Sequence, residues 1–431
     1  MPDRDTQPAP PFLPVPVGDL DLSRPGEAPT PNAAGQVLAL VRVHGVPVGT
    51  LALLEPGEGG PVDLRALALE RLGDAVAAHL AADGLAGAGP DALLDPTVVC
   101  AAAPVADDVR VSVVVCTLGE DPRLKQTVAS VLAQTHPHLE LVVVDNQPAS
   151  GLVPALLQDV DDPRLRVVDQ PRRGLSAARN AGVAAATGEL VAFTDDDAFA
   201  DPGWLARLVR PFAVDPAVVC TTGLVLPAEL ATPAQLWFEE FGAFDKGFVP
   251  TVWSTRPPPP AVAALGARGD GGVLFPYSAG VYGSGNNMAF RLDWLRGQAL
   301  FDEALGAGSP TRGGEDLDAF LAVMFDGRAL VYEPAAVVRH HARADMAALE
   351  RQMYGYGSGM AAVVVKHALR PRRALEIGRR LPAGFRKLLA PGSEKNAGRS
   401  DQFPAELGRS ELRGYAAGPL LYVRARRAAR R

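Results

Sequence analysis

The sequence predicts an α/β domain with a mostly parallel central sheet over residues 109–338, with a small α+β module before it and a helical region after it. Two observations predict this fold class. Continuous apolar segments alternate with helical patterns after Arg110, which is the order of right-handed βαβ units. Polar or acidic residues follow three of the apolar segments, and ligands bind at the carboxyl ends of parallel strands.

Size and composition indicate a globular protein with more than one domain. The chain has 431 residues, of which 48% are hydrophobic, and its formal net charge of −7 gives no reason to expect nucleic acid as a partner. Three cysteines are too few for a disulfide framework, and their spacing matches no zinc knuckle. We interpret Cys116 and Cys220 as small core residues, which suits a reducing compartment.

Targeting signals are not visible in the sequence. The first residues lack the basic start and apolar core of a signal peptide. No segment reaches the roughly 18–20 uninterrupted apolar residues of a transmembrane helix. We therefore expect a cytoplasmic location.

The chain before the α/β domain divides into two parts. Residues 1–34 are rich in proline and poor in aliphatic side chains, so we expect an irregular N-terminus. Residues 35–108 contain the patterns of a β-hairpin over residues 37–54 and of a helix over residues 64–83, followed by a linker. This small α+β module carries no recognisable chemistry, and we expect a docking or capping role for it.

Four apolar segments after Arg110 predict buried parallel strands. They cover residues 111–116, 139–144, 165–168 and 189–194. Helices are expected between them at residues 124–134 and 175–187, the second ending at Gly188.

Asp195, Asp196 and Asp197 directly follow the last of these strands. Three consecutive acids after an apolar strand are costly unless a cation binds them. Mg²⁺ and Mn²⁺ take carboxylate oxygens and bridge phosphates. A helix beginning after Asp201 favours one acid near its N-terminus but does not explain three. The sequence therefore predicts a Mg²⁺ or Mn²⁺ site.

Two further residues are candidates for binding a nucleotide. Asp145, at the end of the second strand, either accepts hydrogen bonds from a base or ribose or closes an Asx turn with Asn146. Arg179 lies in a run of small residues, 174–180, that begins a helix. It either meets a phosphate, or the run serves only helix–sheet packing.

A Gly-rich segment at residues 282–289 contains Asn286 and Asn287. It resembles a dinucleotide-binding fingerprint only superficially, because it lacks the βαβ context, and we expect a strand that lines the substrate site. The aromatic residues at 237–248 indicate an acceptor groove, a core or a hydrophobic lid, and the sequence leaves these open.

Two late motifs carry candidate catalytic groups. Glu315 and Asp316 follow Gly313-Gly314, and they either favour a helix start or place a general base on a mobile loop. His340 and His341 follow a strand pattern, and one imidazole either adds a ligand to the metal or belongs to the surface chemistry of neighbouring arginines.

Taken in order, these motifs resemble glycosyltransferase family 2, the inverting enzymes with the GT-A fold, a Rossmann-like nucleotide-diphospho-sugar transferase fold. The similarity extends over residues 110–357, and it rests on seven motifs together because each motif alone is weak. In chain order they are 113–117, 143–146, 174–180, 193–197, 285–291, 314–316 and His340.

The resemblance implies a role for each site residue. Asp316 matches the catalytic base, with Glu315 beside it. The donor-binding residues it implies are Thr117, Asp145, Arg179, Asp195 and Asp196. The metal ligands it implies are Asp195, Asp197 and His340, although the histidine doublet leaves His341 open. We place Asn286 and Asn287 at the acceptor.

The implied reaction moves a sugar from a nucleotide-diphosphate sugar to an acceptor hydroxyl with inversion, by metal-assisted single displacement. UDP-linked donors are the commonest in the family, while the acceptor stays open. One alternative is a sugar-nucleotide nucleotidyltransferase, although residues 118–122 offer acids where such enzymes have a basic Gly-rich loop. The other is a non-catalytic sugar-nucleotide-binding protein.

Residues 339–431 are expected to be helical and basic. Arginines and lysines alternate with leucines at 372–388, and the last residues are rich in arginine. Such segments bind anionic membranes peripherally, here at the inner face of the plasma membrane, or form a solvated helix face with a frayed tail.

Overall fold

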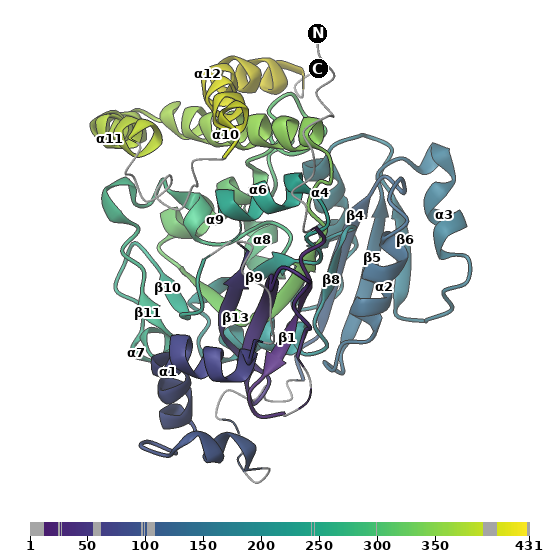
Figure 1. The fold of residues 1–431 in the computed structure, drawn as a ribbon. Helices are drawn as coiled ribbons and strands as arrows, with labels where there is room; N and C mark the ends of the chain where they lie inside the picture. The colour runs from purple at the N-terminus through teal and green to yellow at the C-terminus, as the bar shows by residue number, and fades with distance from the viewer. Residues whose placement is uncertain are drawn as a thin grey trace. The chain divides into compact units, whose positions relative to one another are not determined.

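The computed structural model describes residues 13–24, 26, 28–54, 62–95, 98, 100, 108–242, 244, 246–298, 300–390 and 403–428. The chain forms two compact units (Figure 1). The small unit comprises Met1–Pro104, Pro227–Glu239 and His341–Met346. The large unit comprises Val105–Leu226, Glu240–His340 and Ala347–Arg431.

This division differs from the expected boundaries at 108 and 338. Two short segments from the middle of the chain join the small unit because they bond to it and to each other. Val15 donates its backbone N–H to the carbonyl of Leu230, and the Gln235 side chain donates to the carbonyl of Ala342. Residues 347–431 belong to the large unit.

In the described part of the small unit, α1 packs on a three-stranded sheet. Its elements are β1 (Val17–Asp21), β2 (Val37–Val43), β3 (Val46–Leu53), α1 (Leu64–Ala82), the 3₁₀ helix η1 (Pro90–Leu94) and most of α6 (Pro233–Phe241). β2 and β3 form the expected hairpin, and His44 in its turn has a φ of 51°. The core comprises side chains of the sheet and of α1, including Val41, Leu51 and Val76.

The expectation of an irregular N-terminus is wrong for β1, which pairs in parallel with β2. The proline content of this segment suggested an irregular chain. Leu20 and Leu22, however, are two residues apart, as on one face of a strand, and they are 5% and 0% exposed in the core of the small unit. Residues 1–12 of that expectation lie outside the described part of the chain.

In the described part of the large unit, ten strands form one sheet in the order β11-β10-β13-β9-β12-β7-β4-β5-β6, with β8 paired to β13. They are β4 (Val111–Thr117), β5 (Leu139–Asp145), β6 (Leu165–Asp169), β7 (Leu190–Asp195), β8 (Ala198–Ala200), β9 (Val218–Pro227), β10 (Thr251–Trp253), β11 (Ala267–Arg268), β12 (Met288–Arg291) and β13 (Ala329–His340).

The sheet is parallel in one half and mixed in the other. β7, β4, β5 and β6 are parallel neighbours, as expected. β12 runs antiparallel between β7 and β9, and β13 is antiparallel to β10 and β8. The expectation of a mostly parallel sheet therefore holds for the half formed by β4 to β7. The other half is mixed, because β12 follows a Gly-rich loop instead of a crossover helix.

The helices described in the large unit are α2 (Leu124–Leu132), α3 (Leu152–Leu157), α4 (Leu175–Ala185), α5 (Trp204–Val214), α7 (Pro260–Ala263), α8 (Leu292–Gly297), α9 (Glu315–Asp326), α10 (Met346–Ala368), α11 (Pro371–Leu389) and α12 (Ala405–Ala428). Short 3₁₀ helices are η2 (Pro148–Ser150), η3 (Gly272–Leu274) and η4 (Ala279–Val281). None of the helices in the described ranges is long and apolar enough to span a bilayer.

Alternate residues of the central strands belong to two different cores. Val113 and Val115 pack with α2, α3 and α5, whereas Val114 and Val144 pack with α4 and α9. Because side chains alternate across a sheet, a strand covered on both faces is apolar throughout. This explains why β4 and β5 could be recognised from continuous apolar runs.

The connecting helices change from one face of the sheet to the other, and this change creates a position where a ligand can bind. α2 and α3 lie on one face, and α4, which connects β6 to β7, lies on the other. β4 therefore has β5 on one side and β7 on the other, which is a topological switch point, where open α/β sheets bind ligands. Thr117 of β4 is in register with Asp145 of β5, and Cys116 is in register with Asp195 of β7.

Candidate active site

The acidic triplet lies at the carboxyl end of β7, beside the end of β4. The Thr117 hydroxyl donates to Asp196 Oδ2 at 2.5 Å, and the Thr127 hydroxyl donates to the Asp196 carbonyl at 3.1 Å. Burial raises the pKa of Asp196 to about 7, with Asp197 and Asp195 adding to the effect. Asp196 is thus held by Thr117 and stands outside the possible metal cluster.

Asp195, Asp197 and His340 form that cluster. One ligand atom from each lies within 4.8 Å of the others, and His340 Nε2 is 3.4 Å from Asp197 Oδ1. Burial raises the pKa of Asp195, and the Asp197 carboxylate adds to this against the lowering effect of Arg179. Two carboxylates and one imidazole at this spacing fit Mg²⁺ or Mn²⁺, whose charge would relieve the repulsion.

The pairing of β8 with β13 places His340 opposite Ala198, one residue beyond the triplet. His341 points to a different partner, because its Nδ1 lies 3.2 Å from Glu229 Oε1. Of the histidine doublet, it is therefore His340 that joins the acids. The ring of Phe244 packs edge-on against His340 at 5.3 Å between centroids, so this aromatic residue lies beside the cluster. Phe238 is instead a core residue with 1% exposure.

Arg179 connects the acids of β7 to the start of α9. Its Nη1 donates to Glu315 Oε1 at 2.8 Å, its Nη2 donates to the carbonyl of Gly285 at 2.9 Å, and Nη2 lies 3.6 Å from Asp195 Oδ1. Burial lowers the pKa of Arg179, but Glu315 and the other acids outweigh it and the net shift is upward. A permanent positive charge therefore sits beside Asp195.

The small residues around Arg179 serve packing, as the simpler interpretation of this segment proposed. A Cβ on Gly182 would lie 2.4 Å from Val114 Cγ1, so glycine lets α4 approach β4 closely. The Ser176 hydroxyl donates to the carbonyl of Leu305 at 2.8 Å. Among the described residues of this helix, Arg179 is bonded to Glu315 and lies beside Asp195.

Asp316 accepts two backbone hydrogen bonds at the start of α9. Gly285 donates its N–H to Asp316 Oδ2 at 2.9 Å, and Leu317 donates to Oδ1 at 2.8 Å. The adjacent Glu315 is 5% exposed, and its Oε2 has no hydrogen-bond partner among the described residues. Burial raises the pKa of Glu315, with Asp316 adding to it and Arg179 opposing it. Glu315 is committed to Arg179, which leaves Asp316 as the more accessible carboxylate.

The loop before these acids packs closely against α10. Gly314 has a φ of 96°, and a Cβ there would lie 2.7 Å from the carbonyl oxygen of Gly359 in α10. A Cβ on Gly359 would lie 2.6 Å from the carbonyl carbon of Gly313. The Ser358 hydroxyl donates to the carbonyl of Thr311 at 2.8 Å. The glycines therefore permit backbone-to-backbone packing, which fixes Asp316.

The two asparagines proposed for the acceptor site differ in their hydrogen bonding. Asn287 donates to the carbonyls of Leu224 and Ala336 and accepts from Trp204 Nε1 at 2.8 Å. The expectation of an acceptor contact is therefore wrong for Asn287, because these bonds tie its amide into the protein. Asn286 differs, since both of its amide atoms are buried without a partner among the described residues.

Asp145 forms the Asx turn that the sequence left open, and its second carboxylate oxygen is not used in that turn. Its Oδ1 accepts from the N–H of Gln147 at 2.9 Å, which is an Asx turn, while Oδ2 is buried without a partner in the described chain. Neighbouring Asn146 was missed as a functional residue. It donates to the carbonyls of Gln170 and Arg172 and accepts from the N–H of Gly174, so it orders the approach to α4.

Comparison with known families identifies this region. Residues 112–247 match the profile of "Glycosyl transferase family 2". The chain carries a glycosyl transferase family 2 domain. This confirms the resemblance, and it places the ends of β4, β5 and β7 with the acidic triplet inside the glycosyl transferase domain.

Curated relatives carry the same kind of name. The chain is 39% identical over 147 residues to a glucosyl-dolichyl phosphate glucuronosyltransferase of Haloferax volcanii, which covers 32% of this chain and 47% of the relative. It is 26% identical over 204 residues to a pre-mycofactocin glycosyltransferase of Mycobacterium tuberculosis, which covers 47% of this chain and 38% of the relative. The chain thus spans less than half the length of these relatives.

A solved structure also aligns with the chain. A mannosyltransferase from Pyrobaculum calidifontis in complex with GDP-Man and Mn²⁺ is 20% identical, with a TM-score of 0.45, and the alignment covers 74% of this chain and 86% of that one.

Proposed function

We propose that this chain is a glycosyltransferase that moves a sugar from a nucleotide-diphosphate sugar to an acceptor hydroxyl and inverts the anomeric configuration. The observation that carries the proposal is the cluster of Asp195, Asp197 and His340 within 4.8 Å, at the switch point of the glycosyl transferase domain. Arg179 and Gly285 link this cluster to Asp316. A diphosphate site and a base thus belong to one network.

The donor end of the proposed site is formed by β4, β5 and β7. Asp145 Oδ2, which has no hydrogen-bond partner among the described residues, is an acceptor for a ribose hydroxyl or a base N–H. Asp195, Asp197 and His340 would hold Mg²⁺ or Mn²⁺. The bound ion would supply positive charge for the departing diphosphate, usually the largest catalytic contribution.

At the acceptor end, Asp316 takes the proton of the attacking hydroxyl. The acceptor oxygen forms a bond to the anomeric carbon while the bond from that carbon to the diphosphate oxygen breaks. A single displacement of this kind inverts the configuration. The backbone N–H groups of Gly285 and Leu317 hold Asp316 in place for this step. The buried amide of Asn286 supplies a donor and an acceptor for sugar hydroxyls.

We expect nucleoside diphosphate to be released from one nucleotide sugar when the full chain is incubated with Mn²⁺ or Mg²⁺ and a panel of acceptors. UDP-linked sugars are the first donors to test. The anomeric configuration of the product, read by nuclear magnetic resonance, should be opposite to that of the donor. Release of pyrophosphate would instead identify a nucleotidyltransferase, and binding without any release would identify a non-catalytic sugar-nucleotide-binding protein.

We further propose that α11 contacts anionic membranes from the cytoplasmic side. Leu375, Leu381 and Phe385 are 58%, 47% and 58% exposed on this helix. Exposed Arg372, Arg379 and Arg386 lie next to this apolar stripe, in the pattern of an interfacial helix. Each basic residue near an anionic surface contributes about 1 kcal/mol of binding.

The full chain should therefore float with vesicles containing phosphatidylglycerol and not with vesicles of phosphatidylcholine alone. Replacing Leu375 and Phe385 together by serine should abolish flotation, because the apolar contact is lost. Leu152→Ser, which changes an exposed leucine of α3 outside this helix, should leave flotation unchanged. Equal flotation of all three proteins would contradict the assignment of α11.

A further inference from the structure

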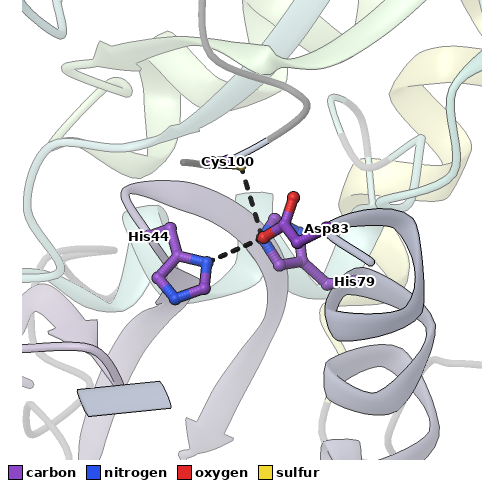
Figure 2. A group of neighbouring side chains, drawn as sticks. All are labelled: His44, His79, Asp83 and Cys100. Carbon is purple, nitrogen blue, oxygen red and sulfur yellow. Dashed lines mark hydrogen bonds and ion pairs between the residues drawn. The ribbon is translucent and has the colours of Figure 1, made fainter. Parts of the chain in front are cut away.

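Four side chains with metal-binding atoms meet in the small unit, apart from the proposed active site. They are His44, His79, Asp83 and Cys100, and Figure 2 shows them turned toward one another. His44 lies in the turn between β2 and β3, His79 in the last turn of α1, and Asp83 caps that helix. Cys100 comes from the segment after η1. Three separate parts of the unit therefore supply the group.

The ligand atoms of this group lie close enough together for one ion to reach all four. Asp83 Oδ2 lies 2.8 Å from His44 Nδ1 and 3.1 Å from His79 Nε2, and Cys100 Sγ lies 3.6 Å from His79 Nε2. All four ligand atoms are within 4.8 Å of one another. With zinc bond lengths of about 2.0–2.3 Å, two ligand atoms at a tetrahedral angle are roughly 3.3–3.6 Å apart. Small side-chain movements would therefore close the site.

All four side chains are enclosed by the protein. The side chains of His44, His79 and Asp83 are 10%, 9% and 1% exposed, and Cys100 is 9% exposed. A buried carboxylate between two imidazoles is stable as a hydrogen-bonded network if an imidazole carries the proton. Such a hydrogen-bonded network does not require a cysteine. The Cys100 thiol beside His79 therefore favours a metal site over a network of this kind.

The kind of ligands selects the kind of ion. Two imidazoles, one carboxylate and one thiolate suit Zn²⁺, whereas Mg²⁺ and Ca²⁺ require oxygen ligands. Four protein ligands also complete the tetrahedral shell, as in structural zinc sites, and leave no position for substrate. The active-site cluster differs on both counts, because it offers two carboxylates and one imidazole.

We propose that His44, His79, Asp83 and Cys100 bind one structural Zn²⁺. The ion would join the hairpin turn, the end of α1 and the chain around residue 100. The ion would stabilise the small unit, whose core consists mainly of side chains from three strands and α1. Small cores gain stability from a metal, because the binding free energy becomes folding free energy.

This site was missed in the sequence because its ligands follow no known zinc pattern. Only His79 and Asp83, four residues apart on one helix face, are close in sequence. His44 and Cys100 are brought to them by the hairpin and by the chain after η1. The sequence of this module, in which we found no recognisable chemistry, therefore does not indicate this group of side chains.

The test is the metal content of the purified full chain. After dialysis against a weak chelator, we expect about one Zn²⁺ per chain by inductively coupled plasma mass spectrometry. His79→Asn and Cys100→Ser should each lower this content strongly. Two controls should retain the zinc: His138→Gln changes an exposed histidine outside the group, and Asp197→Asn changes the separate active-site cluster.

Cobalt provides a second readout, and its result for the wild-type chain does not depend on how any variant folds. Co²⁺ added to the metal-free wild-type chain should give a near-ultraviolet thiolate-to-cobalt charge-transfer band and the intense visible bands of a tetrahedral site. Cys100→Ser should remove the charge-transfer band. Wild-type protein that retains no zinc and shows no such band would overturn the proposal, as would zinc content that is insensitive to both ligand substitutions.

Discussion

Asp316→Asn should lower the turnover number of sugar transfer by about 10²–10⁴-fold, the usual contribution of a general base, while leaving donor affinity nearly unchanged. The amide cannot take the proton of the acceptor hydroxyl. The side chain keeps its size, and its oxygen can still accept from Gly285 or Leu317. Steady-state rates and donor binding by calorimetry, measured on the same protein, separate these two effects.

Glu315→Gln distinguishes the two neighbouring acids. Glu315 accepts from Arg179 at 2.8 Å and is 5% exposed, so its replacement weakens a buried ion pair. Breaking such a pair costs about 3–5 kcal/mol of stability. We therefore expect a lower unfolding temperature for Glu315→Gln, and a larger loss of turnover for Asp316→Asn. The opposite order of the two turnover losses would reassign the base to Glu315.

Asp197→Ala should weaken Mn²⁺-dependent donor binding by at least 10–100-fold, which is the range for losing even an outer-sphere partner of a metal. Asp197 is 5% exposed and lies 3.4 Å from His340, so its loss would leave Asp195 as the single carboxylate of the cluster. Chelation with excess EDTA should abolish activity, and Mn²⁺ should restore it. Activity that persists without divalent ions would contradict the assignment.

The histidine doublet supplies a matched pair of variants for this prediction. His340→Ala removes a cluster residue, whereas His341→Ala removes the adjacent histidine that contacts Glu229. We expect Mn²⁺ affinity to fall only in the first variant. Equal losses in both would mean that the effect is structural and does not arise from coordination.

The parts of the fold that could be predicted from the sequence are those fixed by local patterns. The buried strands β4 and β5 appear as continuous apolar runs because helices cover both faces. The acids at 195–197 were informative because three charges after a buried strand have few structural explanations. Asp316 is far from the triplet in sequence, and it could be predicted because its motif resembles that of the family's catalytic base.

The features that were missed depend on contacts between distant segments. Asn287 and Asn286 are neighbours in sequence, yet only Asn287 is fully bonded, because Trp204 and the carbonyls of Leu224 and Ala336 converge on it. The loop at Gly314 packs closely against Gly359, which lies on a different helix. No local pattern reports either contact.

The claim on which the account depends is that Asp195, Asp197 and His340 hold a divalent ion beside the nucleotide diphosphate. Crystals of the full chain soaked with Mn²⁺ and UDP test it by anomalous diffraction at the manganese edge. We predict a peak within bonding distance of Asp197 and His340, and in contact with the diphosphate. Nucleotide bound elsewhere, or a manganese peak away from these side chains, would contradict the account.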